Sequence, residues 1–356
     1  MSIQDIVGEG WQSVLKLLPE DLDESAVEFK ALQRKRGIAS AGDLLRLGLA
    51  YALGETSLAG ISRWAEGTET GYLSRQALFK RLRNAGPWFE HILSSLLQDA
   101  FDTIPGSVQL IDATSLSIPG SSGTDWRVHL NFNLNTQRMV EAKLTEASTG
   151  ESLNHFSFQP GSLVIADRIY GRPQEIANIQ DAQVIIRMKC SHSGLRDLNG
   201  KPFELLKELV KLKQAERGDY PVQLFSKGKY VCQGRLIAVL QSEAAAGRAR
   251  KKINRKAQRN SRKASLTALE AANYIFVFTN LPAQTYSPQE ILNLYRFRWQ
   301  VELCFKRLKS LIALDDLPMK DPALCRSFLA LKLIAALIIE KLIAQALTFS
   351  PSTQTG

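Results

Sequence analysis

The sequence predicts a mixed α/β protein with a helical N-terminal part, a core that contains a β-sheet, and a β-rich insertion within that core. Apolar residues recur at helical spacing up to about residue 100, and from residue 107 their period changes to two. The alternation breaks between 190 and 272, and helical spacing returns after residue 288. A chain of 356 residues with a hydrophobic fraction of 45% suits two domains, or one domain with a large insertion.

Residues 1–103 are expected to form a helical domain. Residues 58–64 favour a short helix, a polar turn follows, and Ser74 can cap a second helix with the sequence RQALFKRLRN. A helix, a turn and a basic helix have the outline of a helix-turn-helix DNA reader, so the domain at 1–103 is expected to bind DNA. A plain helical hairpin with a basic face explains the same pattern, so both interpretations stay open. The cations on the polar side of the second helix are Arg75, Lys80, Arg81 and Arg83.

The core is expected to comprise residues 104–189 and 273–347, followed by a polar tail at 348–356. Three consecutive strands suggest a meander, and a helical stretch links the fourth strand to the fifth. Two acids, Asp112 and Asp167, stand at the ends of the first and fourth strands, where ligand chemistry collects in open α/β sheets. A further core strand is expected at 274–279, and helices at 288–311 and 321–347. The first five predicted strands are 108–111, 128–134, 139–145, 162–166 and 182–188.

The net charge of +10 is concentrated in one run of the predicted insertion, 190–272. Nine of the sixteen residues from Arg248 to Lys263 are Lys or Arg and none is acidic, so the rest of the chain carries about +1. Clustered cations favour binding to a nucleic-acid backbone, because they release condensed counterions. A solvated loop whose charge only aids solubility is the alternative.

The remaining composition excludes several classes of protein. Four widely spaced cysteines, and four histidines without an i, i+4 pair, give no zinc motif and no disulfide framework. The N-terminus does not have the pattern of a secretory signal. The stretch 328–347 is as long as a membrane span, but Lys332, Glu340 and Lys341 would each cost roughly 2.5–3.5 kcal/mol at membrane depth. We therefore expect a buried helix there, no membrane partner, and a reducing compartment.

Tyr295, Arg298, Glu302 and Lys309 form the strongest constellation in the sequence. On a continuous helix, their intervals of 3, 4 and 7 place them within roughly 60° of one another. One face then offers a phenol, a guanidinium, a carboxylate and an ammonium. An amphipathic helix with an ordinary Arg298–Glu302 ion pair explains the spacing equally well. Trp299 is expected to pack in the core rather than to stack on a base.

Asp112 and Asp167 interrupt or end apolar strands, where an unpaired charge is costly. Acids in such places serve as caps, pair with cations or bind metals. With Glu302 they form a set of carboxylates that can hold hard divalent cations through oxygen. Two such ions would activate a water or hydroxyl and stabilise the leaving oxygen of a phosphodiester. Asp125 is a competing acid, ranked lower because the surrounding PGSSGTD reads as a loop.

The residues around these acids resemble DDE transposases of the insertion-sequence-4 type. That family has a helix signature of Tyr, two residues, Arg, three residues, Glu, six residues and Lys, which the constellation at 295–309 matches at every interval. The first family aspartate is followed closely by Thr on a strand, as at 112–114, and the second precedes an aromatic–Gly pair, as at 167–171. The family also carries a β-rich insertion between the second aspartate and the glutamate. The resemblance covers roughly residues 30–345.

The resemblance implies an RNase H-like core in which Asp112, Asp167 and Glu302 are catalytic and bind two Mg²⁺ or Mn²⁺ ions. It implies that water first cuts the phosphodiester at an element end. The freed 3′-hydroxyl then attacks target DNA, which is cut-and-paste transposition.

The resemblance also implies the partners. Tyr295, Arg298 and Lys309 would contact double-stranded DNA near the cleaved end, and a homodimer would pair two element ends. Some relatives flip a base onto an aromatic residue from the strand before this helix; Tyr274 is the candidate by spacing, although burial is the stronger expectation for it. Some relatives also carry a longer C-terminal assembly domain, whereas this chain ends soon after Leu347. A bacterial, cytoplasmic, nucleoid-associated protein is expected.

Two other functions compete with an active transposase. A catalytically inactive DNA-binding relic that acts as a repressor explains the basic run and the helical hairpin, and it needs no carboxylate triad. A glycosidase with two carboxylates explains neither the basic run nor the constellation at 295–309. The presence of all three acids favours the transposase.

Overall fold

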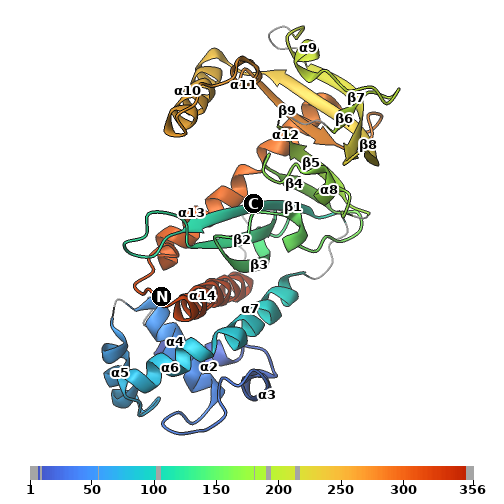
Figure 1. Ribbon diagram of the computed structural model, residues 1–356. Coiled ribbons are helices and arrows are strands. Elements are labelled where there is room, and N and C mark those ends of the chain that lie inside the picture. The colour runs from blue at the N-terminus through green and yellow to red at the C-terminus, as the bar shows by residue number, and fades with distance from the viewer. Residues whose placement is uncertain are drawn as a thin grey trace, which may run out of the picture.

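The structure, a computed structural model, describes residues 7–8, 10–54, 56–101, 106–179, 181–189, 194–212 and 217–349. Figure 1 shows the N-terminal helices at one end, strands of a large sheet through the middle, and the inserted strands and helices at the other end. The predicted mixed α/β class is therefore confirmed. The predicted domain boundaries near 103 and 190 lie outside the described residues, as does the predicted tail from residue 350 on.

The N-terminal part is helical, as predicted. Serine side chains cap three of its helices: Ser40 forms a capping box with Asp43, Ser57 accepts a hydrogen bond from the Gly60 amide at 3.3 Å, and Ser74 accepts one from the Ala77 amide at 3.2 Å. The capping role predicted for Ser74 is thereby confirmed. The helices are α2 (Trp11–Leu15), α3 (Leu22–Glu28), α4 (Ala41–Leu53), α5 (Leu58–Gly67), α6 (Arg75–Asn84) and α7 (Gly86–Phe101).

Helices α5 and α6 are the two helices of the predicted hairpin, but α6 uses half of its cations internally. Arg81 donates to the carbonyl oxygens of Arg34 and Arg36, at 3.0 and 2.6 Å. Arg83 pairs with Asp321 at 3.1 Å. The two remaining cations of α6, at positions 75 and 80, are exposed. The basic face of α6 therefore has a structural part as well as an accessible part.

A single sheet of nine strands runs through the described core and insertion. Its order is β3-β2-β1-β4-β5-β9-β8-β7-β6. β1 pairs in parallel with β4, and β4 with β5, while the other pairings are antiparallel. The strands are β1 (Val108–Leu116), β2 (Trp126–Asn133), β3 (Arg138–Glu146), β4 (Leu163–Ala166), β5 (Gln183–Arg187), β6 (Leu195–Arg196), β7 (Arg217–Ser226), β8 (Lys229–Leu240) and β9 (Tyr274–Thr279).

The two faces of the sheet bury different cores. Successive strand residues point to opposite faces. Leu110 and Ile165 join one core, which is continuous with the N-terminal helices, whereas Ile111 and Ala166 join a second core on the other face. Short connections complete this part of the chain: a 3₁₀ turn at Leu153–His155 before β4, and α8 (Pro173–Ile176) before β5.

Helix α14 (Pro322–Phe349) joins the N-terminal helices to the sheet. It packs against α4, α6 and α7 and against β3, and Figure 1 shows it between these elements. Its residues 328–338 are buried, including Lys332, whose ammonium donates to the carbonyl oxygens of Ala313 and Asp316. The predicted buried helix is confirmed. In the part of the chain that the structure describes, no helix is long and apolar enough to cross a membrane.

The insertion continues the sheet, because β9 pairs with both β5 and β8. It also contains the helices α9 (Leu205–Leu209), α10 (Glu243–Arg259) and α11 (Leu266–Ala271). Most of the basic run lies on α10, so the alternative of a basic loop is wrong for residues 248–259. Figure 1 shows α10 projecting from the inserted strands.

A buried cation ties the insertion to the helices that follow it. Arg235 on β8 is 7% exposed and pairs with Asp219 at 2.6 Å. Arg235 also donates to the carbonyl oxygen of Tyr286 at 2.9 Å. Ser287 then begins α12 (Pro288–Arg296) with a capping box to Glu290. The inserted strands thus help to fix where α12 starts.

The single helix predicted at 288–311 is wrong, because it is broken into α12 and α13 (Trp299–Ile312). At the break, the Arg298 amide bonds to the Tyr295 carbonyl at 3.1 Å and the Gln300 amide to the Phe297 carbonyl at 2.9 Å. These are i→i−3 bonds, which tighten the helix to about three residues per turn. Apolar spacing does not reveal such a local tightening, because both flanking helices keep the usual period.

Replacement of Ala313 by glycine should stabilise the protein by about 0.5–1 kcal/mol. Ala313 ends α13 in the left-handed region, with φ +47°, where a side chain is costly and glycine is not. Ala344→Gly, on the right-handed helix α14, is the matched control and should cost about 1 kcal/mol. Urea unfolding measures both; a loss of stability in Ala313→Gly would contradict the proposed backbone geometry.

Candidate active site

The pairing of β1 with β4 brings the two predicted strand-end acids together. Ile111 lies opposite Ala166 in this parallel ladder. Asp112, the next residue of β1, and Asp167, the first residue after β4, therefore occupy neighbouring positions. Both positions continue the series of Leu110 and Ile165, which face the core on the α13 side of the sheet. The register therefore places two carboxylates side by side.

Glu302 comes to the same place on α13, which packs against β1. Arg298 lies between the acids: its Nη2 is 2.6 Å from Glu302 Oε1, and its Nη1 is 3.8 Å from Asp112 Oδ2. The Arg298 and Asp112 side chains are each 20% exposed, whereas that of Glu302 is 55% exposed. The ion pair that spacing suggested is present, and it extends to a third residue from another element.

Tyr295 belongs to this group and Lys309 lies apart from it. Burial, together with the nearby Asp167 carboxylate, raises the pKa of Tyr295 to about 12. Its phenol therefore stays neutral and can donate a hydrogen bond at physiological pH. Lys309 lies seven residues beyond Glu302, about 10 Å along the helix axis. The break at residues 297–298 changes the predicted common face, yet the first three members still meet.

Asp112 has the most perturbed carboxyl of the group. Burial raises its pKa to about 6, and the neighbouring Glu151 and Glu302 carboxylates act in the same direction. The Ala113 amide, which donates to Asp112 Oδ1 at 2.9 Å, and the Arg298 cation oppose this rise. Such perturbed groups gather at functional sites.

Glu151 is an acid of this site that the sequence analysis did not single out. Its Oε1 lies 3.8 Å from Arg127 Nε, and Arg127 also donates to the carbonyl oxygens of Ala147 and Thr149 at 2.6 and 2.7 Å. Burial raises the pKa of Glu151, and the nearby Asp167 adds to the rise. The signal available in the sequence was an acid in the Gly-containing connection after a strand.

Gly171 shows why the aromatic–Gly pair follows Asp167. A Cβ at this position would lie 2.9 Å from the Arg187 carbonyl oxygen and 3.2 Å from the Met188 sulfur. Only glycine permits this close approach of the chain to the residues at the end of β5. Tyr170, just before it, is fully buried beneath the site.

Three other predictions concern single residues. Asp125 has a structural role, since its carboxylate accepts a hydrogen bond from the Ile118 amide at 2.9 Å. Tyr274 is buried, as expected. The expectation that Trp299 packs in the core is wrong: it is 48% exposed, and Phe297 is 42% exposed. These two residues lie on either side of Arg298 at the tightened turn, and both of their rings are exposed there.

Comparison with known proteins fits this arrangement. The family model described as "Transposase DDE domain" matches residues 104–338. The chain belongs to the DDE transposase family. It is 34% identical to the putative transposase InsL of insertion sequence element IS186A from Escherichia coli (strain K12), over 96% of each chain. It is also 34% identical to the transposase of insertion sequence element IS421 from Escherichia coli, again over 96% of each chain. The predicted family is thereby confirmed, and with it a function in DNA transposition.

Membership of the DDE transposase family implies that the chemistry depends on a divalent metal ion. The donor set suits such an ion, because Asp112, Asp167 and Glu302 offer only carboxylate oxygens, which hard cations prefer. In the residues described, no three His, Cys, Asp or Glu side chains are already grouped to hold a metal. The guanidinium of Arg298 lies between two of the carboxylates instead. The residues fit a metal by type and by register.

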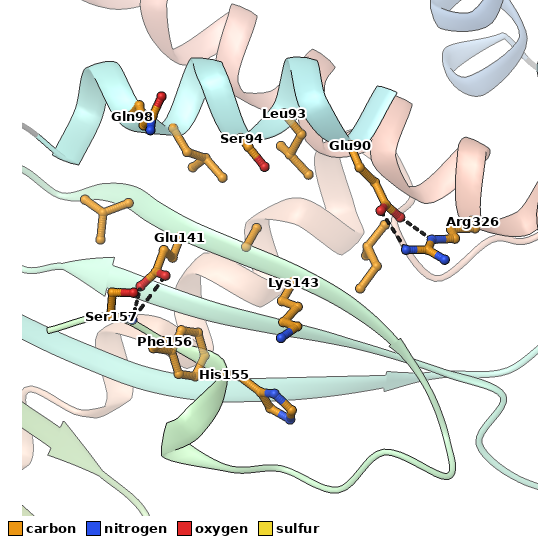
Figure 2. A pocket seen from close by; sticks show the side chains of 14 residues that line it. Glu90, Leu93, Ser94, Gln98, Glu141, Lys143, His155, Phe156, Ser157 and Arg326 are labelled. Atoms are coloured by element: carbon orange, nitrogen blue, oxygen red, sulfur yellow. Dashed lines mark hydrogen bonds and ion pairs between the residues drawn. The ribbon is translucent and has the colours of Figure 1, made fainter. Parts of the chain in front are cut away.

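A cavity of about 480 Å³ lies elsewhere, between α7 and β3. Figure 2 shows Glu90 paired with Arg326 at one end and Glu141 accepting a hydrogen bond from the Ser157 amide at the other. None of the predicted site residues lines this cavity. It marks the seam between the N-terminal helices and the edge strand of the sheet. Asp112 lies instead within β1, and Asp167 directly after β4, in the middle of the sheet.

Asp112→Asn should stabilise the metal-free protein by about 1–3 kcal/mol at pH 8, and much less at pH 4.5. Because the pKa of Asp112 is raised in the folded protein, ionisation of Asp112 lowers the free energy of unfolding. This loss of stability is absent below pH 3.8, the ordinary pKa of the group, and is complete above about pH 6, its pKa in the folded protein. Stability therefore falls as the pH rises from 3.8 to about 6. Asparagine cannot ionise, so the Asp112→Asn variant does not show this fall in stability. Thermal melts in EDTA at both pH values test this, with the exposed Glu66→Gln as the control. An equal gain at both pH values would show that Asp112 is not perturbed.

Proposed function

We propose that Asp112, Asp167 and Glu302 are the catalytic carboxylates, that they bind two Mg²⁺ or Mn²⁺ ions, and that they cut DNA at insertion-sequence ends and join the freed 3′-hydroxyl to target DNA. The observation that carries the proposal is the β1–β4 register, which sets Asp112 beside Asp167 below the helix that bears Glu302. Bound divalent ions would stabilise charge on the attacking and leaving oxygens of the phosphodiester.

The sheet supports the RNase H-like part of the proposal. An antiparallel β3-β2-β1 unit is continued by the parallel strands β4 and β5, and the acids lie on β1, directly after β4 and on a covering helix. The carboxyl ends of parallel strands are where α/β sheets place their ligands. The insertion enters after β5 and returns through β9, so it leaves the acid-bearing strands intact.

Three residues of α12, α13 and the turn between them are suited to hold the DNA near the cut. Tyr295 offers a neutral hydroxyl, Arg298 a forked guanidinium and Lys309 an ammonium two turns further on. A guanidinium can bind a phosphate through two parallel hydrogen bonds. The separation of about 10 Å between Glu302 and Lys309 suits contact with a phosphate one or two nucleotides from the scissile bond.

Helix α10 supplies a second, sequence-independent grip on the DNA backbone in this proposal. Six of its seven cations lie within roughly 140° of the helix circumference, opposite the side that carries Ala246 and Ile253. Arg250 alone pairs with an acid, Glu243, among the cations of α10. The others make no ion pair within the described ranges, and their like charges repel one another along the helix. A polyanion relieves that repulsion.

The proposal includes a homodimer that pairs two element ends, because each chain carries one set of carboxylates and an element has two ends. The exposed cations Arg75 and Lys80 on α6 would add DNA contacts from the N-terminal helices. The mass of the complex with end DNA, measured by light scattering, tests the dimer; one chain per paired complex would exclude it.

Glu302→Gln and Asp167→Asn should abolish Mg²⁺-dependent nicking of a plasmid that carries the element ends, while binding to end DNA persists. Each change removes an anionic oxygen donor without changing side-chain size. Glu28→Gln, an exposed change on α3, is the control and should nick normally. Full nicking by both active-site variants would refute the catalytic assignment. Binding without nicking by the wild type would favour the inactive relic.

Replacement of Arg248, Lys252, Arg255 and Arg259 by glutamine should weaken DNA binding and flatten its salt dependence. Loss of each phosphate contact should lower the slope of log K against log [salt] by about 0.9. Lysine at the three arginine positions, with Lys252 left unchanged, keeps the charge and should preserve the slope. Fluorescence anisotropy over a salt series measures it. If the glutamine variant keeps the wild-type slope, the cations of α10 are only solvated and do not bind DNA.

A further inference from the structure

Arg298 occupies the space between two of the proposed metal ligands. Its two terminal nitrogens reach different carboxylates, Glu302 at 2.6 Å and Asp112 at 3.8 Å. The tightened turn fixes the backbone at Arg298, where its amide bonds to the Tyr295 carbonyl. Nowhere in the described chain are three acids, histidines or cysteines grouped for a metal. A side-chain cation therefore bridges the carboxylates here.

A guanidinium and a divalent cation compete for such a site. Arginine stays charged at any physiological pH. Arg298 engages carboxylate oxygens that a hard cation would bind, through a hydrogen bond to Glu302 and an ion pair with Asp112. The two positive charges would also repel each other at short range. Metal entry thus requires the Arg298 guanidinium to move away from Asp112 and Glu302.

We propose that Arg298 is an internal counter-ion that hinders metal binding until a DNA phosphate draws it away. This inference rests on the proposed function, in which Arg298 contacts DNA near the cleaved end. The same guanidinium cannot satisfy a phosphate and bridge both carboxylates. A phosphate offers it a bidentate partner of higher charge, so DNA binding opens the carboxylates to metal. By linkage, metal then strengthens DNA binding by the same factor.

The test is the affinity of the full chain for Mn²⁺ in the absence of DNA, measured by electron paramagnetic resonance of the free ion. Arg298→Gln should bind Mn²⁺ about 5–150-fold more tightly than the wild type, the usual range of coupling between two sites. Arg296→Gln is the matched control: it removes an exposed cation two residues away that lies outside the bridge. It should leave Mn²⁺ affinity within about twofold.

Arg298→Lys distinguishes two ways in which Arg298 could hinder metal binding: by bridging two carboxylates, or only by its positive charge. Lysine keeps the charge and helix propensity but has no fork with which to span two carboxylates. The bridge predicts tighter Mn²⁺ binding in this variant too, whereas a field effect alone predicts wild-type affinity. Wild-type affinity in both Arg298 variants, or an equal gain in Arg296→Gln, would overturn the inference.

The failure of this inference can be told apart from failure of the proposed function. Glu302→Gln should lose most of the Mn²⁺ binding of the Arg298→Gln background, which assigns the signal to this site. If that double variant binds Mn²⁺ as well as Arg298→Gln alone, the metal ligands are wrong. If it loses binding but Arg298→Gln shows no gain over wild type, only the counter-ion role is wrong.

Discussion

The parallel pairing of β1 with β4 is the constraint on which the rest of the site depends. It fixes Asp112 and Asp167 as neighbours through the backbone hydrogen bonds that set the register. A slip of one residue in either strand would send one carboxylate to the opposite face. The apolar residues before each acid, Leu110 and Ile165 on one face and Ile111 and Ala166 on the other, specify that register from both sides of the sheet.

Two acids forced together in this way need a positive charge nearby. Glu302 and Glu151 add to the negative charge, and burial raises the pKa of Asp112 further. The only cation shown within 4.0 Å of Asp112, among the described residues, is Arg298. The ten excess positive charges of the chain are mostly far from this point, on and just after α10. Local electrostatics at the acids are therefore separate from the basic surface of the insertion.

Much of the fold and of the candidate site could be predicted from the sequence, wherever burial sets the spacing of apolar residues. The run YIFVFT became β9 with its expected bounds, and Asp167 directly follows β4 as expected. The expectation that Asp112 ends its strand is wrong, because β1 continues through Asp112 to Leu116 in its pairing with β2. The break between α12 and α13 could not be predicted, because apolar spacing continues on both sides of it. That break explains the error over Trp299, whose expected orientation assumed a continuous helix. Glu151 was missed because a loop acid gains its meaning only from the fold around it.

The central question is whether three distant segments of the chain form one metal site. Fe²⁺ can be bound in place of Mg²⁺ with end DNA present. When ascorbate and peroxide are added, the bound Fe²⁺ generates hydroxyl radicals that cut the protein backbone near the metal. Cuts are expected close to Asp112, Asp167 and Glu302 together, and all three should be lost in Asp167→Asn. Cuts confined to one of these segments, or an unchanged pattern in Asp167→Asn, would contradict it.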